Sequence, residues 1–166
     1  MLVLGVDPGT ASTGFGLVSQ AADGTLVLVE CGVIGTSPAE STPSRLLELH
    51  RSLAQIVGRH QPESAAVEKL FFQKNVSTAM GVGQARGVIL LTMAQASVPV
   101  YEYEPREVKL AMTGYGNADK RQIQSMVAAI LQLSSAPKPD DAADALALAI
   151  CHLTQMRLKE RLREGD

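Results

Sequence analysis

The first segment of the chain is an apolar run that ends in a carboxylate. Residues 1–6 read Met-Leu-Val-Leu-Gly-Val, and Asp7 follows them directly, ahead of Pro8 and Gly9. An ionised carboxylate at the end of a buried strand is costly unless positive charge compensates for it. The fold must therefore bring something cationic to Asp7.

Two further segments also carry acids at the boundary of an apolar stretch. Residues 65–67 (Ala-Ala-Val) run into Glu68, while Asp141 and Asp144 open the apolar stretch 145–150. If the three segments converge, their carboxylates repel one another unless cations bridge them. Hard oxygen ligands suit divalent metals, and a two-metal site suits phosphodiester hydrolysis. Acids at strand ends and helix N-termini are also common structural features, so spacing alone leaves both interpretations open.

The order of apolar runs and turns predicts an α/β fold with helices on both faces of a mixed five-stranded sheet. We expect strands over 2–7, 14–19, 25–34, 64–68 and 98–102. Helices are expected from 41–43 to about 60, over about 78–96, 105–112 and 119–131, and from 137–140 onward. Short turns make the first three strands antiparallel, whereas crossovers through helices make the first, fourth and fifth strands parallel. Asp7 and Glu68 would then emerge at the same edge of the sheet, with Asp141 and Asp144 on one face of the last helix.

Composition is consistent with a single domain. The chain has 166 residues, of which 46% are hydrophobic and 19% charged, enough to bury a substantial core. We expect this domain to cover 1–156 and to be followed by a solvated tail, 157–166. The net charge of −2 argues against an indiscriminate coat for nucleic acid but leaves room for a metal-dependent nuclease.

The apolar and cysteine patterns indicate a cytoplasmic protein. No apolar stretch reaches the roughly 20 residues of a membrane span, and the first run lacks the basic flank of a signal peptide. Cys31 and Cys151 have no second thiol or histidine at ligand spacing, so we interpret them as reduced core residues.

A series of motifs, taken in order, resembles the RuvC family of bacterial Holliday junction resolvases. The series runs from Leu2 to His152 and comprises Gly5-Val6-Asp7-Pro8-Gly9 with Gly14-Phe15-Gly16, Val67-Glu68, Lys74-Asn75, Gly83-Gln84-Ala85-Arg86-Gly87-Val88, Glu107-Val108-Lys109 and Asp141-Ala142-Ala143-Asp144-Ala145-Leu146-Ala147. The resemblance implies an RNase H-like fold of the retroviral integrase superfamily and a homodimer. It also implies an endonuclease for recombination and DNA repair that cuts four-way DNA junctions symmetrically and leaves 5′-phosphate and 3′-hydroxyl ends. RuvA and RuvB, which drive branch migration, are the implied protein partners.

Roles for individual residues follow from the same resemblance. The catalytic and metal-binding residues would be Asp7, Glu68, Asp141 and Asp144, holding two Mg²⁺ or Mn²⁺ ions per active site. The DNA-binding residues would be Lys109, Lys120 and Arg86 at phosphates, and Phe71, which would stack on an unpaired base. The structural alternatives are a solvated surface for the lysines and a core or dimer interface for Phe71 and Phe72.

Two features outside the acid motifs also allow structural interpretations. Asp140 precedes the third acid and is interpreted as a helix N-cap rather than a ligand. Gly81, Gly83 and Gly87 are unfavourable within one helix, which predicts close helix approach, either inside the chain or across a two-fold axis.

Other functions fit the sequence less well. Residues 7–10 also resemble the first phosphate loop of actin-like ATPases and sugar kinases, but those folds need two related domains and a second Asp-x-Gly loop, which this sequence lacks. An RNase H-like nuclease acting on RNA or RNA:DNA hybrid and a junction-binding module without catalysis are the remaining alternatives. The four acids and the order of the motifs favour the resolvase.

Overall fold

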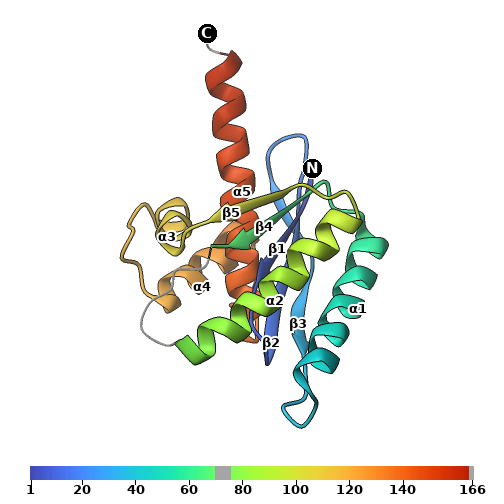
Figure 1. Cartoon of the computed structure of the whole chain (residues 1–166). Helices are drawn as coiled ribbons and strands as arrows, with labels where there is room; N and C mark the ends of the chain where they lie inside the picture. Colours follow the sequence, from blue (N-terminus) through green and yellow to red (C-terminus); the bar gives the residue numbers. More distant parts are fainter. Residues whose placement is uncertain (70–75, 165–166) are drawn as a thin grey trace.

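The computed structural model describes residues 1–69 and 76–164, and within them the strands form a mixed five-stranded sheet (Figure 1). The strands are β1 (Leu2–Asp7), β2 (Ser12–Gln20), β3 (Leu26–Gly35), β4 (Ser64–Glu68) and β5 (Val100–Tyr103), in the spatial order β3-β2-β1-β4-β5. The first three strands pair antiparallel, and β4 pairs parallel with both β1 and β5. The predicted sheet and its strand directions are confirmed.

Helices cover both faces of the sheet (Figure 1). On one face, α1 (Thr42–His60) and α2 (Val76–Gln95) pack over a core that includes Leu4 and Val67. The other face carries α3 (Pro105–Thr113), α4 (Lys120–Ile130) and α5 (Asp140–Glu164) over a core that includes Val3 and Ala66. Successive residues of β1 and β4 thus point to opposite layers, as the two-residue period of a strand requires.

Local sequence signals set where several helices begin. Ser41 caps α1, where its hydroxyl accepts from the Ser44 N–H, and Pro43 lies in the first turn. Asp119 caps α4 and exchanges hydrogen bonds with Gln122 in a capping box. The last helix continues to Glu164, within the segment expected to be a solvated tail, and projects beyond the sheet (Figure 1). None of the described helices is long and apolar enough to cross a membrane.

Close contact between α5 and the sheet depends on two strand glycines. A Cβ atom on Gly5 would overlap the Ala145 carbonyl, and one on Gly14 would overlap the carbonyl of Asp141. Because both positions lack a side chain, the first turns of α5 lie directly on the backbone of β1 and β2. This contact brings the acidic start of α5 to the edge of the sheet where β1 ends.

A buried histidine joins α5 to the strands on the other side of β1. His152 is fully buried; its Nδ1 lies 2.7 Å from the Tyr103 hydroxyl and its Nε2 lies 3.0 Å from the Ser64 hydroxyl. Burial lowers the pKa of His152 to about 4, with a smaller contribution from Lys159. His152 is therefore a neutral, structural residue.

Candidate active site

Three of the predicted acids meet at the carboxyl end of β1. Asp7 is the last residue of β1, while Asp141 and Asp144 lie in the first turns of α5, three residues apart on one helical face. Each of the three offers a carboxylate oxygen, and these oxygens all lie within 4.8 Å of one another. The arrangement is that of a cation site with hard oxygen ligands.

The fourth acid, Glu68, lies beside this group. It ends β4, which runs parallel to β1, with Val6 opposite Val67 in the register. Glu68 lines a pocket of about 150 Å³ together with Asp7, Asp144 and Lys109. Parallel pairing of β1 and β4 thus places Asp7 and Glu68 at one edge of the sheet, as predicted from strand order.

Burial and repulsion from neighbouring acids disfavour ionisation of Asp7, Glu68 and Asp144. Burial, followed by the charges of Glu68, Asp144 and Asp141, raises the pKa of Asp7 to about 7, and Lys120 opposes the shift. The pKa of Glu68 is also raised, by burial and then by Asp144. A divalent cation would relieve this repulsion, so the donor set fits a metal site.

Lys120 supplies positive charge to the acidic start of α5. Its Nζ atom lies 3.1 Å from Oδ2 of Asp144 and 3.4 Å from Oδ2 of Asp140. The pKa of Asp144 is raised overall, because the effect of burial exceeds the opposing effect of the hydrogen bond from Lys120. The other oxygen of Asp140 accepts from Nε2 of Gln124, so this carboxylate contacts α4.

The family model described as "Crossover junction endodeoxyribonuclease RuvC" matches residues 3–152, nearly the whole chain. This chain belongs to the RuvC family. A RuvC family member from Roseiflexus sp. (strain RS-1), named crossover junction endodeoxyribonuclease RuvC, is 54% identical over 162 residues, which cover 98% of this chain and 96% of the relative.

Two solved structures of RuvC family members share the fold. The structure of Thermus thermophilus RuvC superposes with a TM-score of 0.90 at 38% identity and covers 96% of this chain and 97% of that one. T. thermophilus RuvC in complex with its Holliday junction substrate gives a TM-score of 0.87 at 36% identity, covering 95% and 96% of the two chains. The expected RNase H-like fold is therefore confirmed.

The DNA-binding residues suggested by resemblance to the RuvC family occupy different environments. Lys109 lines the acid pocket, which is the pocket that also contains Asp7, Glu68 and Asp144. Lys120 forms an ion pair with Asp144. Arg86 forms an ion pair with Glu102 of β5, and its buried Nε atom has no hydrogen-bond partner among residues 1–69 and 76–164. Phe71, like Phe72, lies outside the described residues.

Sequence reasoning missed a hydroxyl that contacts the site. Ser12, the first residue of β2, donates from Oγ to Oδ2 of Asp141 at 2.6 Å. The signal was available in the spacing: Ser12 follows the short turn after Asp7, so an antiparallel hairpin returns it to the same edge of the sheet.

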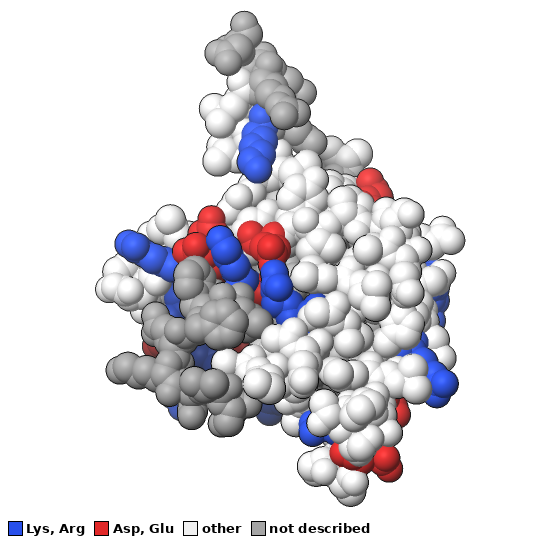
Figure 2. Space-filling model, viewed as in Figure 1, with Lys and Arg blue, Asp and Glu red and all other residues white. Residues whose placement is uncertain are grey.

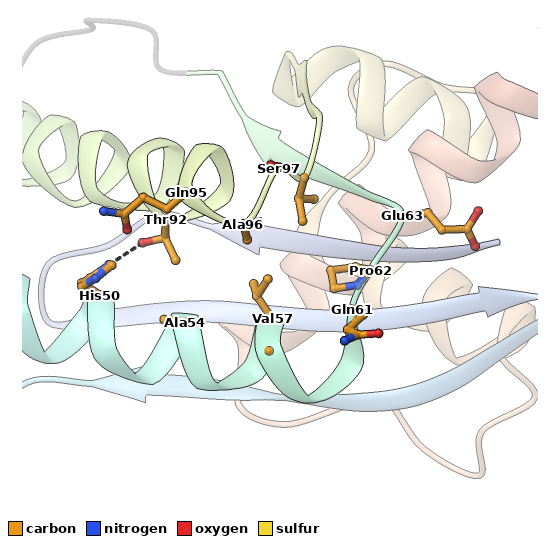
Figure 3. A pocket seen from close by; sticks show the side chains of 12 residues that line it. His50, Ala54, Val57, Gln61, Pro62, Glu63, Thr92, Gln95, Ala96 and Ser97 are labelled. Carbon is orange, nitrogen blue, oxygen red and sulfur yellow. Dashed lines mark hydrogen bonds between the residues drawn. The ribbon is translucent and has the colours of Figure 1, made fainter.

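A wider pocket lies at the opposite edge of the sheet, away from the RuvC family acids. It has a volume of about 610 Å³ and is lined by the C-terminal halves of α1 and α2 and by the residues that precede β4 and β5 (Figure 3). Its one carboxylate, on Glu63, accepts a hydrogen bond from the Leu2 N–H. Thr92 donates to the Val88 carbonyl, so His50 must donate from Nδ1 to Thr92. The Glu63 carboxylate and the His50–Thr92 pair thus already have hydrogen-bond partners. The pocket that Asp7, Glu68 and Asp144 line remains the candidate active site.

Replacing Asp7 with asparagine should stabilise the metal-free protein at alkaline pH. The pKa of Asp7 is about 7 in the folded chain against an ordinary value of 3.8. The folded chain therefore holds this proton more tightly than the unfolded chain, and the free energy of unfolding falls as pH rises from 3.8 to about 7. In EDTA at pH 8, we expect the free energy of unfolding of Asp7→Asn to exceed that of the original protein by roughly 1–3 kcal/mol. Urea titrations at pH 8 and pH 5 measure the difference, which should shrink at the lower pH.

Asp23→Asn is the matched control for this stability experiment. The hydrogen bond from the Thr25 backbone N–H lowers the pKa of the exposed Asp23, so replacing Asp23 with asparagine should bring no gain in stability.

Saturating Mg²⁺ should remove the stability advantage of Asp7→Asn, because a ligand that binds the folded state of the original protein stabilises it. Equal stability of the original protein and Asp7→Asn in EDTA at pH 8 would contradict the predicted repulsion.

Proposed function

We propose that this chain is a Holliday junction resolvase that hydrolyses phosphodiester bonds with two divalent metal ions. The observation that carries the proposal is the convergence of Asp7, Asp141 and Asp144, whose carboxylate oxygens lie within 4.8 Å of one another. Membership of the RuvC family and the 0.87 TM-score to a family member solved with Holliday junction substrate support the choice of DNA substrate. Recombination and DNA repair in the bacterial cytoplasm are the setting in which such junctions arise.

Mg²⁺ or Mn²⁺ would be held by Asp7, Glu68, Asp141 and Asp144. Such ions, when bound, would supply a lower pKa for the attacking water and stabilisation of the departing oxygen, and cleavage would leave a 5′-phosphate and a 3′-hydroxyl. The chain itself contributes fixed carboxylates on two parallel strands and one helix, so little reorganisation is needed when ions and DNA arrive.

Lys109 and Lys120 would bind the DNA backbone near the acids. Lys109 lines the acid pocket, and the exposed Lys120 sits at the N-terminus of α4. Figure 2 shows basic and acidic side chains intermixed on the side of the molecule that carries α3 and α4. Positive charge here would attract phosphates toward carboxylates that would otherwise repel them. Phosphate contact by Arg86 and base stacking by Phe71 remain predictions.

A homodimer through α2 is part of the same proposal, because two symmetric nicks require two active sites. The 20-residue α2 carries one charged residue, Arg86, which is engaged by Glu102. Met80 is 65% exposed and Leu91 is 55% exposed. Beyond the adjacent residues and the backbone of α2 itself, no atom in the described part of the chain lies within 4 Å of a Cβ added to Gly83 or Gly87. Few charged side chains cover this part of the surface (Figure 2). Such a flat, apolar helix face suits a second copy of the chain, with RuvA and RuvB as further partners.

The proposed activity predicts symmetric cleavage of a four-way DNA junction. A synthetic junction should receive paired nicks in Mg²⁺ or Mn²⁺ and none in EDTA, whereas linear duplex and RNA:DNA hybrid of the same sequence should stay intact. Asp7→Asn should bind the junction and fail to cut it, because a metal ligand is lost. Denaturing gels of end-labelled strands measure cleavage, and gel shifts measure binding.

The alternatives give different outcomes in this assay. Cleavage of the hybrid would indicate a ribonuclease, and junction binding without cleavage would indicate a binding module. Full activity of Asp7→Asn would overturn the assignment of the acids.

Lys109→Ala should reduce the salt dependence of junction binding. If Lys109 neutralises one phosphate, the slope of log binding constant against log salt concentration should fall in magnitude by about one. Lys159→Ala, on the exposed projecting end of α5, is the matched control and should leave the slope unchanged. Equal slopes for Lys109→Ala and the original protein would assign Lys109 to the solvated surface.

Leu91→Glu should convert the dimer to monomers, because it places a charge on the apolar face of α2. Leu158→Glu on α5 is the matched control, since Leu158 is 59% exposed and Leu91 is 55% exposed. Sedimentation equilibrium measures the mass of each variant. A dimer that survives Leu91→Glu and dissociates with Leu158→Glu would move the interface from α2 to α5.

A further inference from the structure

The hydroxyl of Ser12 makes a short contact with a proposed metal ligand. Its Oγ atom donates to Oδ2 of Asp141 at 2.6 Å, at a partly buried position that joins β2 to the start of α5. Hydrogen bonds from a hydroxyl to a carboxylate at this distance are among the stronger ones in proteins. Ser12 thus ties the Asp141 carboxylate to β2 through Oδ2.

We infer that Ser12 is a positioning residue for the metal site: its hydroxyl holds the Asp141 carboxylate where it offers an oxygen within 4.8 Å of those of Asp7 and Asp144. The inference rests on the proposed metal-dependent function and concerns how this chain prepares one ligand for it. Residues that hold a metal ligand in position without contacting the metal commonly increase the affinity of the site for the metal.

The turn that presents Ser12 is clamped by two other elements. The carbonyl of Thr10 accepts from the Arg45 guanidinium at 2.7 Å and from the Thr36 hydroxyl at 2.6 Å. Arg45 also donates to Thr36 at 2.9 Å, so the three residues form a closed set of hydrogen bonds. Arg45 belongs to α1 and Thr36 follows β3, and together they fix the turn between β1 and β2 from the far side of the sheet.

The same turn is also tied within itself. The Thr13 hydroxyl donates to the Gly9 carbonyl at 2.7 Å, and Thr13 is almost fully buried. A Cβ atom on Gly9 would overlap the carbonyl of Ser12, so the backbone passes close to itself here. A donor carried by such a constrained turn is already oriented before any metal binds.

Without this donor, repulsion would favour a different position for Asp141. Asp7 and Asp144 both present oxygens within 4.8 Å of an oxygen of Asp141. Like charges at this separation drive a side chain toward water when nothing holds it. Lys120 holds Asp144 from α4, and Ser12 holds Asp141 from β2. Asp141 and Asp144 thus have separate donors, and that of Asp141 adds no charge to the site.

Mn²⁺ binding to Ser12 variants tests the inference apart from catalysis. Isothermal titration calorimetry and Mn²⁺ electron paramagnetic resonance should show about 10-fold weaker binding or worse for Ser12→Ala. Ser12→Thr and Ser12→Val form a matched pair of nearly equal shape that differs in the hydroxyl, so Thr should retain affinity and Val should lose it. Ser19→Ala, at the other end of β2, should bind Mn²⁺ as the original protein does. Urea unfolding in EDTA is measured for every variant.

The outcomes separate this inference from the proposed function. Equal Mn²⁺ affinity for Ser12→Thr and Ser12→Val would overturn the role of Ser12 while leaving the metal site in place. If the original protein binds no Mn²⁺ and Asp141→Asn changes nothing, the metal-dependent function itself fails. Loss of affinity in Ser12→Val, with an unfolding midpoint matching that of Ser12→Thr, is the expected result.

Discussion

Repulsion among carboxylates is the constraint around which this protein is built. Asp7, Glu68, Asp141 and Asp144 come from β1, β4 and α5, and burial of Asp7, together with the charges of the other three acids, raises its pKa to about 7. The core must hold the three elements in place against this repulsion when no ion is bound. Neutral burial of His152 and the close seating of α5 on the sheet both serve that purpose. A fold that tolerates such a cluster is prepared to gain stability from cations.

Much of this architecture could be predicted because local patterns and topology rules agree. The run ending in Asp7 and the run ending in Glu68 have the length and bounds of the observed strands β1 and β4. Crossover rules then make these strands parallel, which is enough to bring both acids to one edge. The position of α5 needed one more inference, that its first turn reaches the same edge, and the structure confirms it.

The remaining features depend on side-chain directions that emerge only from packing. Lys120 could be recognised as a basic residue near the site, but its contact with both Asp140 and Asp144 depends on how α4 packs against α5. Phosphate contact by Arg86 stays a prediction, and the ion pair that packing of α2 gives it with Glu102 of β5 could not be read from the sequence. Ser12 was visible in a turn of small polar residues, and its contact with Asp141 joins positions 129 residues apart. Spacing in the β1–β2 hairpin returns Ser12 to the edge of the sheet that carries Asp7, but its contact with Asp141 depends on how α5 packs on β2.

The seating of α5 on Gly5 and Gly14 has a consequence for how this protein tolerates change. At these two positions main chain meets main chain, with no side chain in between to act as a spacer. The separation between Asp7 and the acids of α5 is therefore set by the thickness of two backbones, a quantity that substitutions elsewhere in the core leave untouched. Cores accept many conservative replacements at modest cost in stability. The protein can thus vary widely in its apolar interior while the spacing of its reactive carboxylates stays constant.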